Sequence, residues 1–459
     1  MPGLVDLRRS KAPVELIAVT PATLEAALVE LGPAARRWAS AQDFRGDAGS
    51  CCPLPQADGK VAAILGGVSR GDDLYALAAL PTRLPAGDYA LSTRGLALDA
   101  PRVALGWALA SYEFTRYRKP RRAGARLAVP TAVLKTVAPL AAASCRVRDL
   151  VNTPTEDLGP AELATAVREL ADEHAAGYRE WVGEALRRAD FPAIHAVGRA
   201  SHREPRLVEL TWGKRGPHVA IIGKGVCFDT GGLDLKTGDG MRWMKKDMGG
   251  AAHAIALAGL ILDAKLPIRL TLLIPAVENA IAANALRPGE VIRTRAGISV
   301  EVDNTDAEGR LILGDAMAYA AEQKPDLILD LATLTGAARI ALGPDLPALF
   351  TNRDELAEEL LAVARDIQDP LWRLPLWRPY LTMLESSCAD LANAGPSRHA
   401  GAITAALYLE RFVPESQAWL HLDTYAWNDG ERPGRPRGGE AQGLRACFEM
   451  LRRRYGEKN

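Results

Sequence analysis

The chain has 459 residues, and its 56 Lys and Arg residues equal its 56 Asp and Glu residues, which gives a formal net charge of zero. The length predicts two to three domains at roughly 150 residues each, and the 24% of charged and 48% of hydrophobic residues exclude a disordered chain. A neutral chain lacks the basic surplus of most duplex-binding domains, so we do not expect nucleic acid as its main partner.

The N-terminal residues 1–20 are interrupted by charges and lack the apolar stretch and cleavage site of a signal peptide. No apolar run along the chain reaches the ~18 residues that a transmembrane helix needs. The six cysteines include no CxxC pair, which is typical of proteins from a reducing compartment. We therefore expect a cytoplasmic protein without membrane contact.

Short apolar runs alternate with helical patterns over the first 150 residues. We predict strands over 14–20, 60–68 and 88–95, and helices over 22–31 and 104–114. An Ala- and Leu-rich helical stretch then ends at a turn over 152–154, and it predicts the boundary between two domains. We place the first domain at 1–145 and the second at 146–459.

The second domain continues this alternation. Its predicted helices span 160–173, 178–190, 249–264, 308–323, 354–367 and 402–412. Its predicted strands span 205–212, 218–223, 268–277, 297–304, 326–334 and 418–423. Several of these are continuous apolar runs, as in sheets covered on both faces. The predicted fold class is α/β, with a smaller N-terminal α/β domain and a larger C-terminal domain in which a mixed sheet lies between helices.

Polar residues gather after two predicted strands of the second domain. The first segment runs from Gly223 to Lys236 and continues over 245–250, and the second runs from Asn304 to Arg310. Ligands bind beyond the carboxyl ends of the strands in open α/β sheets. Both segments therefore fall where a binding site is expected.

The two segments supply four carboxylates, those of Asp229, Asp247, Asp306 and Glu308. Four carboxylates in one pocket repel one another and stay ionised only with cations among them. Two divalent ions would balance them, and oxygen-rich ligands without Cys or His pairs favour Mg²⁺, Mn²⁺ or Zn²⁺ at a hydrolytic site. A two-metal site activates water and polarises a carbonyl, so hydrolysis is the reaction class indicated.

Two lysines, Lys224 and Lys236, lie on either side of Asp229 in the sequence. A lysine beside two divalent ions could lose its proton and bind a metal as a neutral amine. A lysine outside the metal shell would stay a cation and could stabilise an oxyanion. The residues alone do not assign the two roles.

Each segment also has a purely structural interpretation. The glycine-rich residues 223–232 could form a tight turn, and they match neither phosphate-binding glycine motif. The Thr305 to Glu308 segment fits a capping box at the start of the following helix. The combination of two acidic, glycine-rich segments in one domain, each with a basic residue, favours the metal hydrolase.

These residues resemble the leucine aminopeptidase family, the M17 cytosolic metallo-aminopeptidases. The octapeptide NTDAEGRL at 304–311 is the signature of that family. The other motif of the family matches residues 223–225, 228–229, 231–232, 236, 240–241 and 245–250. The resemblance extends in detail over about 148–425. It implies a metallo-exopeptidase of the leucyl aminopeptidase type, acting on peptides with a free α-amine and assembled as a homohexamer.

The resemblance also implies a set of ligands for two divalent metal ions per subunit. We expect these ions to be zinc or manganese, with magnesium as the alternative. Asp229 and Glu308 would bridge the two ions. Asp306 would complete one site through its carboxylate and its backbone carbonyl, and Lys224 and Asp247 would complete the other.

The remaining roles follow from the same resemblance. Lys236 would polarise the substrate carbonyl and stabilise the oxyanion, and Arg310 would bind a bicarbonate ion that acts as general base. Met244, Thr333 and Gly336 would line the pocket for the first side chain of the substrate. Leu334 would lie beside the bicarbonate ion.

Some residues differ from the usual pattern of the family. Asp234 stands where a small polar residue is usual, and Thr424 to Trp427 follow the last predicted strand where the family usually has Ile-Ala-Gly. Two aromatic residues near the pocket argue against assuming a preference for leucine. Two other functions stay open: a DNA-binding or regulatory protein with secondary peptidase activity, and a dinuclear metal hydrolase of another substrate class.

Overall fold

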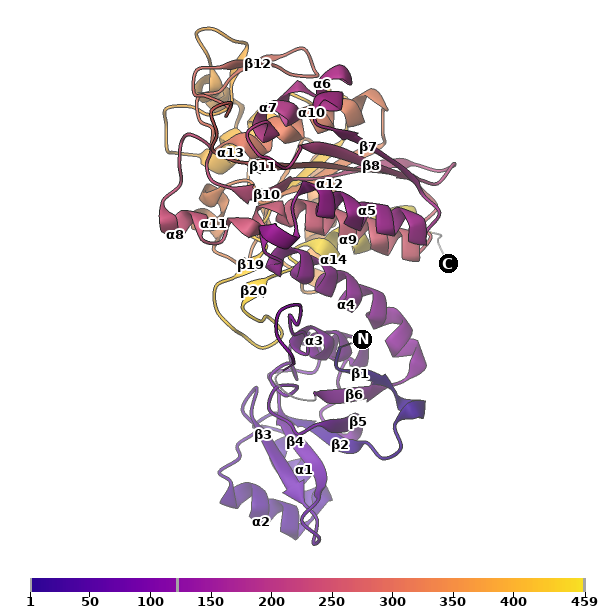
Figure 1. Ribbon diagram of the computed structural model, residues 1–459. Coiled ribbons are helices and arrows are strands. Elements are labelled where there is room, and N and C mark those ends of the chain that lie inside the picture. The colour runs from indigo at the N-terminus through magenta and orange to yellow at the C-terminus, as the bar shows by residue number, and fades with distance from the viewer. Residues whose placement is uncertain (1, 121–123, 457–459) are drawn as a thin grey trace. The chain divides into compact units, whose positions relative to one another are not determined.

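The computed structural model describes residues 2–120 and 124–456 (Figure 1). The chain forms two compact units, Met1–Cys145 with Asn428–Gly438, and Arg146–Trp427 with Gly439–Asn459. The segment Asn428–Gly438 thus groups with the first unit, although the predicted range of the second domain includes it. In the part of the chain that the structure describes, no helix is both long and apolar enough to cross a bilayer.

The first unit contains a six-stranded sheet in the order β1-β6-β5-β2-β4-β3. All neighbouring strands are parallel except β3 and β4. The strands are β1 (Leu4–Asp6), β2 (Val14–Val19), β3 (Cys51–Pro55), β4 (Val61–Gly67), β5 (Gly87–Gly95) and β6 (Ala125–Val129). The helices are α1 (Leu24–Leu31), α2 (Pro33–Ala41), α3 (Ala100–Ala110) and the start of α4 (Thr131–Asn152).

The sequence of β2 shows why both faces of this sheet are covered. Successive side chains of a strand point to opposite faces. Leu16 and Ala18 accordingly pack in one apolar core with α3, and Ile17 and Val19 pack in a second core with α1 and α2. Successive residues of β2 therefore pack alternately into the two cores.

The second unit contains a nine-stranded sheet with the path β16-β15-β18-β14-β9-β11-β8-β7, and β10 pairs with β11 off this path. The sheet is mixed, since β9, β11, β14 and β18 run parallel while β8 lies antiparallel to β11 and β7. Its strands are β7 (Gly177–Val182), β8 (Arg206–Trp212), β9 (His218–Gly223), β10 (Gly225–Asp229), β11 (Arg269–Asn279), β14 (Leu327–Ala332), β15 (Ala348–Thr351), β16 (Trp372–Arg373) and β18 (Trp419–Asp423).

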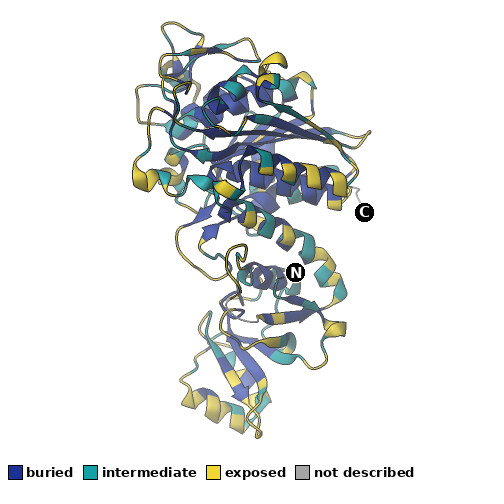
Figure 2. Cartoon of the chain, in the orientation of Figure 1, coloured by how far each residue is buried: buried dark blue, intermediate teal, exposed yellow. Residues whose placement is uncertain are grey.

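Helices cover both faces of the large sheet (Figure 1). One face carries α5 (Pro160–Glu173), α9 (Gly249–Asp263), α12 (Asp354–Asp366) and α14 (Leu444–Tyr455). The other carries α7 (Pro192–Gly198), α10 (Glu308–Glu322) and α13 (Gly401–Glu410). Figure 2 shows the sheet buried between these layers. The predicted α/β fold class, with its mixed sheet between helices, is confirmed.

Smaller elements complete the second unit. They are α6 (Glu184–Arg188), α8 (Gly238–Met241), α11 (Gly336–Leu342) and a three-stranded sheet of β12 (Val291–Arg293), β13 (Ser299–Glu301) and β17 (Leu391–Ala392). The strands β19 (Trp427–Asn428) and β20 (Gly438–Gly439) pair with each other at the two ends of the segment Asn428–Gly438. The small sheet corrects one expectation. The predicted strand 297–304 is not a member of the large sheet but forms β13 beside it.

The predicted helix over 178–190 is wrong in its first half. The chain forms strand β7 there, turns at Gly183 with φ of 54°, and then forms the short helix α6. The strand pairs antiparallel with β8, and the ring of Trp181 packs against Phe191 and Tyr319 at centroid distances of 5.2 and 5.7 Å. Tertiary pairing at the sheet edge thus overrides the helical pattern of the sequence.

Candidate metal centre

The polar segments meet at one end of the large sheet. Lys224 follows β9, Asp229 ends β10 and Thr333 follows β14, so the carboxyl ends of three strands supply the site, as expected for an open α/β sheet. Asp247 lies in a short 3₁₀ helix, Met244–Met248, directly before α9. The second acidic segment follows β13 of the small sheet, and its last residues, from Glu308 to Arg310, form the start of α10.

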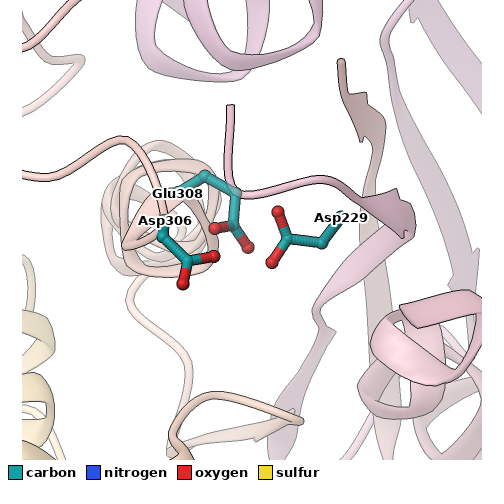
Figure 3. A group of neighbouring side chains, drawn as sticks. All are labelled: Asp229, Asp306 and Glu308. Carbon is teal, nitrogen blue, oxygen red and sulfur yellow. The ribbon is translucent and has the colours of Figure 1, made fainter. Parts of the chain in front are cut away.

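Three carboxylates converge at this end of the sheet. One oxygen each of Asp229, Asp306 and Glu308 lies within 4.8 Å of the other two, and Figure 3 shows the three groups facing a common point. Metal–oxygen distances of roughly 2.0–2.6 Å place the ligands of one ion at such separations. The geometry of these three residues therefore fits a bound cation.

Lys224 connects the fourth carboxylate to this group. The side chain is 3% exposed, and its Nζ lies 2.7 Å from Asp247 Oδ2 and 3.1 Å from Glu308 Oε1. Burial alone would lower the pKa of Lys224, but the surrounding carboxylates raise it above its ordinary value. Gly309 makes room for this lysine, since a Cβ at that position would lie 2.5 Å from Lys224 Cε.

Lys236 connects the outer pair of carboxylates. The side chain is 16% exposed, with Nζ 2.8 Å from Asp229 Oδ2, and it also donates a hydrogen bond to Asp306. Burial lowers its pKa, but the three nearby carboxylates, those of Asp229, Glu308 and Asp306, raise it by more. The structure thus places one lysine inside the carboxylate group and one at its outer edge.

The carboxylates carry more negative charge than the lysines balance. If all four carboxylates are ionised, two ammonium groups leave an excess of two negative charges, which raises the pKa of these carboxylates in the absence of a cation. Burial and the repulsion of Asp229 raise the pKa of Glu308 to about 8 and that of Asp306 to about 6, and burial raises the pKa of Asp247. The Oε2 atom of Glu308 is buried without a hydrogen-bond partner. Excess charge and an unpaired buried oxygen both fit a divalent cation.

Hydrogen bonds join the two acidic segments. Asn279 Nδ2 donates to Asp229 Oδ1 at 2.8 Å and to the backbone oxygen of Thr305 at 3.1 Å. Asp234 Oδ2 accepts from the backbone N–H of Thr305 at 2.7 Å, and Thr305 Oγ1 donates to the backbone oxygen of Gly231 at 2.6 Å. Thr305 therefore does not cap α10, so the capping-box interpretation is wrong. Asp234, which differs from the usual residue of the family, thus accepts one of the hydrogen bonds that hold the two segments together.

Asn393 is a supporting residue that the sequence did not indicate. Its side chain is fully buried, and its Oδ1 accepts from the backbone N–H groups of Asp303 at 2.8 Å and Asn304 at 3.1 Å. Its Nδ2 donates to the backbone oxygens of Asn304 at 2.7 Å and Ala307 at 3.2 Å. These bonds fix the backbone on either side of Asp306. No local pattern marks a residue that acts across some 89 positions of the chain.

Arg310 lies in the first turn of α10, two residues after Glu308, and is buried. One guanidinium nitrogen donates to the backbone oxygen of Asn393 at 2.6 Å, while Nε has no hydrogen-bond partner. Burial lowers its pKa. In the described residues no carboxylate forms an ion pair with Arg310, so the unpaired donor fits a small anion.

A cavity of about 600 Å³ opens beside the carboxylates. Its walls include every predicted metal-binding residue except Glu308, and also Lys236. The four predicted pocket residues also line it, namely Met244, Thr333, Leu334 and Gly336. Thr333 in turn contacts Asp247, whose backbone oxygen and Oδ1 both lie 2.9 Å from Thr333 Oγ1. Among the described residues that line the cavity there is no histidine.

Comparison with known proteins identifies the family. The model of the catalytic domain of the cytosol aminopeptidase family matches residues 145–448, and that of the M17 aminopeptidase N-terminal domain matches residues 12–130. The chain belongs to the cytosol aminopeptidase family. The resemblance predicted from the motifs is confirmed, and so, at the level of the family, is the predicted class of enzyme, a leucyl aminopeptidase-type peptidase.

Two of the curated proteins that are similar in sequence to this chain are probable cytosol aminopeptidases. The relative from Syntrophotalea carbinolica is 44% identical over 309 residues, which cover 66% of this chain and 62% of the relative. The relative from Geobacter sp. is 37% identical over 460 residues, which cover 92% of each protein. The first match thus spans less than two thirds of the relative's length, whereas the second spans nearly all of it.

Solved structures agree with the family. The cytosol aminopeptidase of Coxiella burnetii superposes with a TM-score of 0.95 at 47% identity, over 97% of this chain and 98% of that one. The bottromycin maturation enzyme BotP in complex with Mn superposes with a TM-score of 0.87 at 34% identity, over 97% of this chain and 100% of that one. The M17 family is metal-dependent, in agreement with the carboxylates gathered here.

Proposed function

We propose that this chain is a metallo-aminopeptidase that removes the N-terminal residue from peptides with a free α-amine. The observation that carries the proposal is the excess of negative charge at the wall of a cavity large enough for a peptide end, with a lysine facing that cavity. Catalysis belongs to residues 146–459, the predicted C-terminal domain. Family membership supports the same activity.

Five side chains would bind two divalent ions, zinc or manganese in the first place and magnesium as the alternative. Asp229 and Glu308 would bridge the ions, Asp306 would complete one site, and Lys224 and Asp247 the other. When bound, the ions would supply Lewis acidity toward the scissile carbonyl and toward the attacking water. Lys224 must lose a proton to act as a ligand, so metal binding and its deprotonation are linked.

Lys236 would act on the substrate itself. Lys236 lines the cavity, its side chain is 16% exposed, and its Nζ can donate a hydrogen bond to the carbonyl oxygen of a bound peptide. Such a donor stabilises the negative charge that develops on that oxygen. Lys236 is thereby a catalytic residue, whereas Lys224 is a ligand.

Arg310 would bind a bicarbonate ion. Support comes from the buried guanidinium, whose Nε has no partner, and from the lack of a histidine among the described residues of the cavity wall. The bicarbonate would supply a general base near pH 7. Leu334 would lie beside it.

The substrate pocket and the assembly complete the proposal. Met244, Thr333 and Gly336 would receive the first side chain of the peptide. The resemblance to the family also supports a cytoplasmic homohexamer. Light scattering tests the assembly, since a hexamer has six times the 49.2 kDa of one chain.

Three substrates test the activity. Leucine p-nitroanilide, its N-acetyl derivative and p-nitrophenyl phosphate are assayed after dialysis against EDTA and again after addition of Zn²⁺ or Mn²⁺. We expect metal-dependent hydrolysis of the free-amine anilide alone. Hydrolysis of the phosphomonoester without the anilide would instead support a hydrolase of another substrate class.

A further inference from the structure

One wall of the cavity is positively charged and is not used by the proposed mechanism. Lys246 and Arg339 line the cavity together with Tyr425. Lys246 Nζ and the guanidinium carbon of Arg339 each lie 4.8 Å from the centre of the Tyr425 ring. In the part of the chain that the structure describes, neither cation forms an ion pair with a carboxylate.

Two cations gathered at one ring favour an anion in the cavity. Lys246 is 6% exposed, so it has lost most of its hydration, and a cation–π contact replaces only part of that loss. The repulsion between two like charges adds to the cost. A carboxylate placed between them would relieve both.

The other acidic residues of the cavity wall do not supply that carboxylate. Asp423 accepts hydrogen bonds from the backbone N–H groups of Leu334 and Thr335 and from the Thr335 hydroxyl. Its two oxygens thus hold the chain at the start of α11. Asp239 is exposed on α8 and forms no ion pair with either cation in the described residues.

The position of Arg339 relates this charge to the substrate. Gly336 and Arg339 lie three residues apart on α11 and therefore on the same face of the helix. Gly336 presents no side chain to the cavity, and no atom lies within 4 Å of the point where its Cβ would stand. A side chain that enters over Gly336 therefore extends toward Arg339.

We propose that this cavity selects peptides whose N-terminal residue is acidic, with the Glu or Asp carboxylate received by Arg339 and Lys246 beside the Tyr425 ring. The inference rests on the proposed aminopeptidase function and assigns its substrate class. The aromatic ring keeps both cations in place, and Gly336 leaves the path to them open.

The test compares isosteric substrates on the same enzyme preparation. The ratio of kcat/KM for glutamate and glutamine p-nitroanilides isolates the side-chain charge, because metal content and folded fraction cancel. We expect the native enzyme to favour glutamate by about 10–100-fold, as for one hydrogen bond to a charged group. Arg339→Gln is expected to lose most of that preference, and Arg339→Glu to favour lysine p-nitroanilide instead.

Arg215→Gln is the matched control, because Arg215 is an exposed arginine on the loop before β9, and its ratio should equal that of the native enzyme. A native ratio of one or below, with leucine p-nitroanilide still cleaved, overturns this inference alone. So does an Arg339-dependent preference for Leu-Ala over its C-terminal amide, which would assign the cations to the far end of the substrate. If the native enzyme hydrolyses none of the anilides, the proposed function is overturned, and this inference with it.

Discussion

The two lysines of the metal centre make similar ion pairs in different surroundings. Lys224 pairs with Asp247 and Glu308, and all three side chains are at most 5% exposed. Lys236 pairs with Asp229 and Asp306 and is 16% exposed itself, with Asp306 at 32%. Burying a charge is costly unless its partner stays in place. The inner lysine is therefore a structural part of the centre, whereas the outer one is free to exchange its partners for a substrate.

The largest expected effect follows from removing the inner lysine. Lys224→Met leaves two carboxylates buried without their cation, so we expect the free energy of unfolding to fall by about 3–5 kcal/mol in EDTA. Denaturant unfolding measures it. Lys236→Met is the matched comparison, and we expect a smaller loss because Asp306 is 32% exposed and Asp229 keeps its hydrogen bonds from Gly231 and Asn279. Equal losses in both variants would contradict the distinction between the lysines.

The outer lysine should show its effect in the rate. Lys236→Ala removes one oxyanion donor, so we expect kcat to fall about 10²–10³-fold. Metal content, measured by elemental analysis, should stay at the native level, because Lys236 is not a proposed ligand. An unchanged kcat, or a loss of metal, would reassign this residue.

A smaller effect is expected from the residues that hold the carboxylates. Asn279→Ala removes the donor to Asp229 Oδ1, and we expect the affinity for Mn²⁺ to fall about 10–100-fold, as for other groups that orient metal ligands. Calorimetric titration of the apoprotein gives the dissociation constant. Asn284→Ala is the control, since Asn284 is exposed and donates to the backbone oxygen of Arg199 away from the centre. An unchanged affinity for Mn²⁺ in Asn279→Ala would contradict the proposal that Asn279 orients Asp229 as a metal ligand.

The smallest expected effect is the dependence on pH. The pKa of Glu308 is raised from 4.5 to about 8, so the folded apoprotein binds more protons than the unfolded chain and loses stability as pH rises through this range. Metal must displace that proton, so Glu308 should contribute about a tenfold rise in the affinity for Mn²⁺ per pH unit between about 6 and 8, in addition to the contribution of the Lys224 proton. Titration in buffers of different ionisation enthalpy counts the protons released. An affinity independent of pH would contradict the raised pKa.

The sequence was sufficient for some residues of the site and insufficient for others. Asp229 and Asp306 were predicted because each lies in a polar segment directly after an apolar strand, a signal contained in neighbouring residues. Asn279 and Asn393 were not given a role, because they reach their partners across some 50 and 89 positions of the chain. No local pattern reports such a contact.

The fold shows the same division. Most helices and strands of the second unit were predicted from their periodicity, whereas the first half of the segment 178–190 was assigned a helix instead of a strand. Strand β7 exists because β8 offers an edge to pair with, and pairing partners are not visible in a local pattern. The grouping of Asn428–Gly438 with the first unit was missed for the same reason.

That late segment has a consequence for the order of biosynthesis. Gly434, at φ of 75°, and Arg435 pack against the ring of Tyr75, with the Arg435 guanidinium 5.3 Å from the ring centre. A nascent chain folds from its N-terminus as it leaves the ribosome, yet the first unit stays incomplete until residue 438 has been translated. Its sheet can form early, but the face around Tyr75 waits for nearly the whole polypeptide.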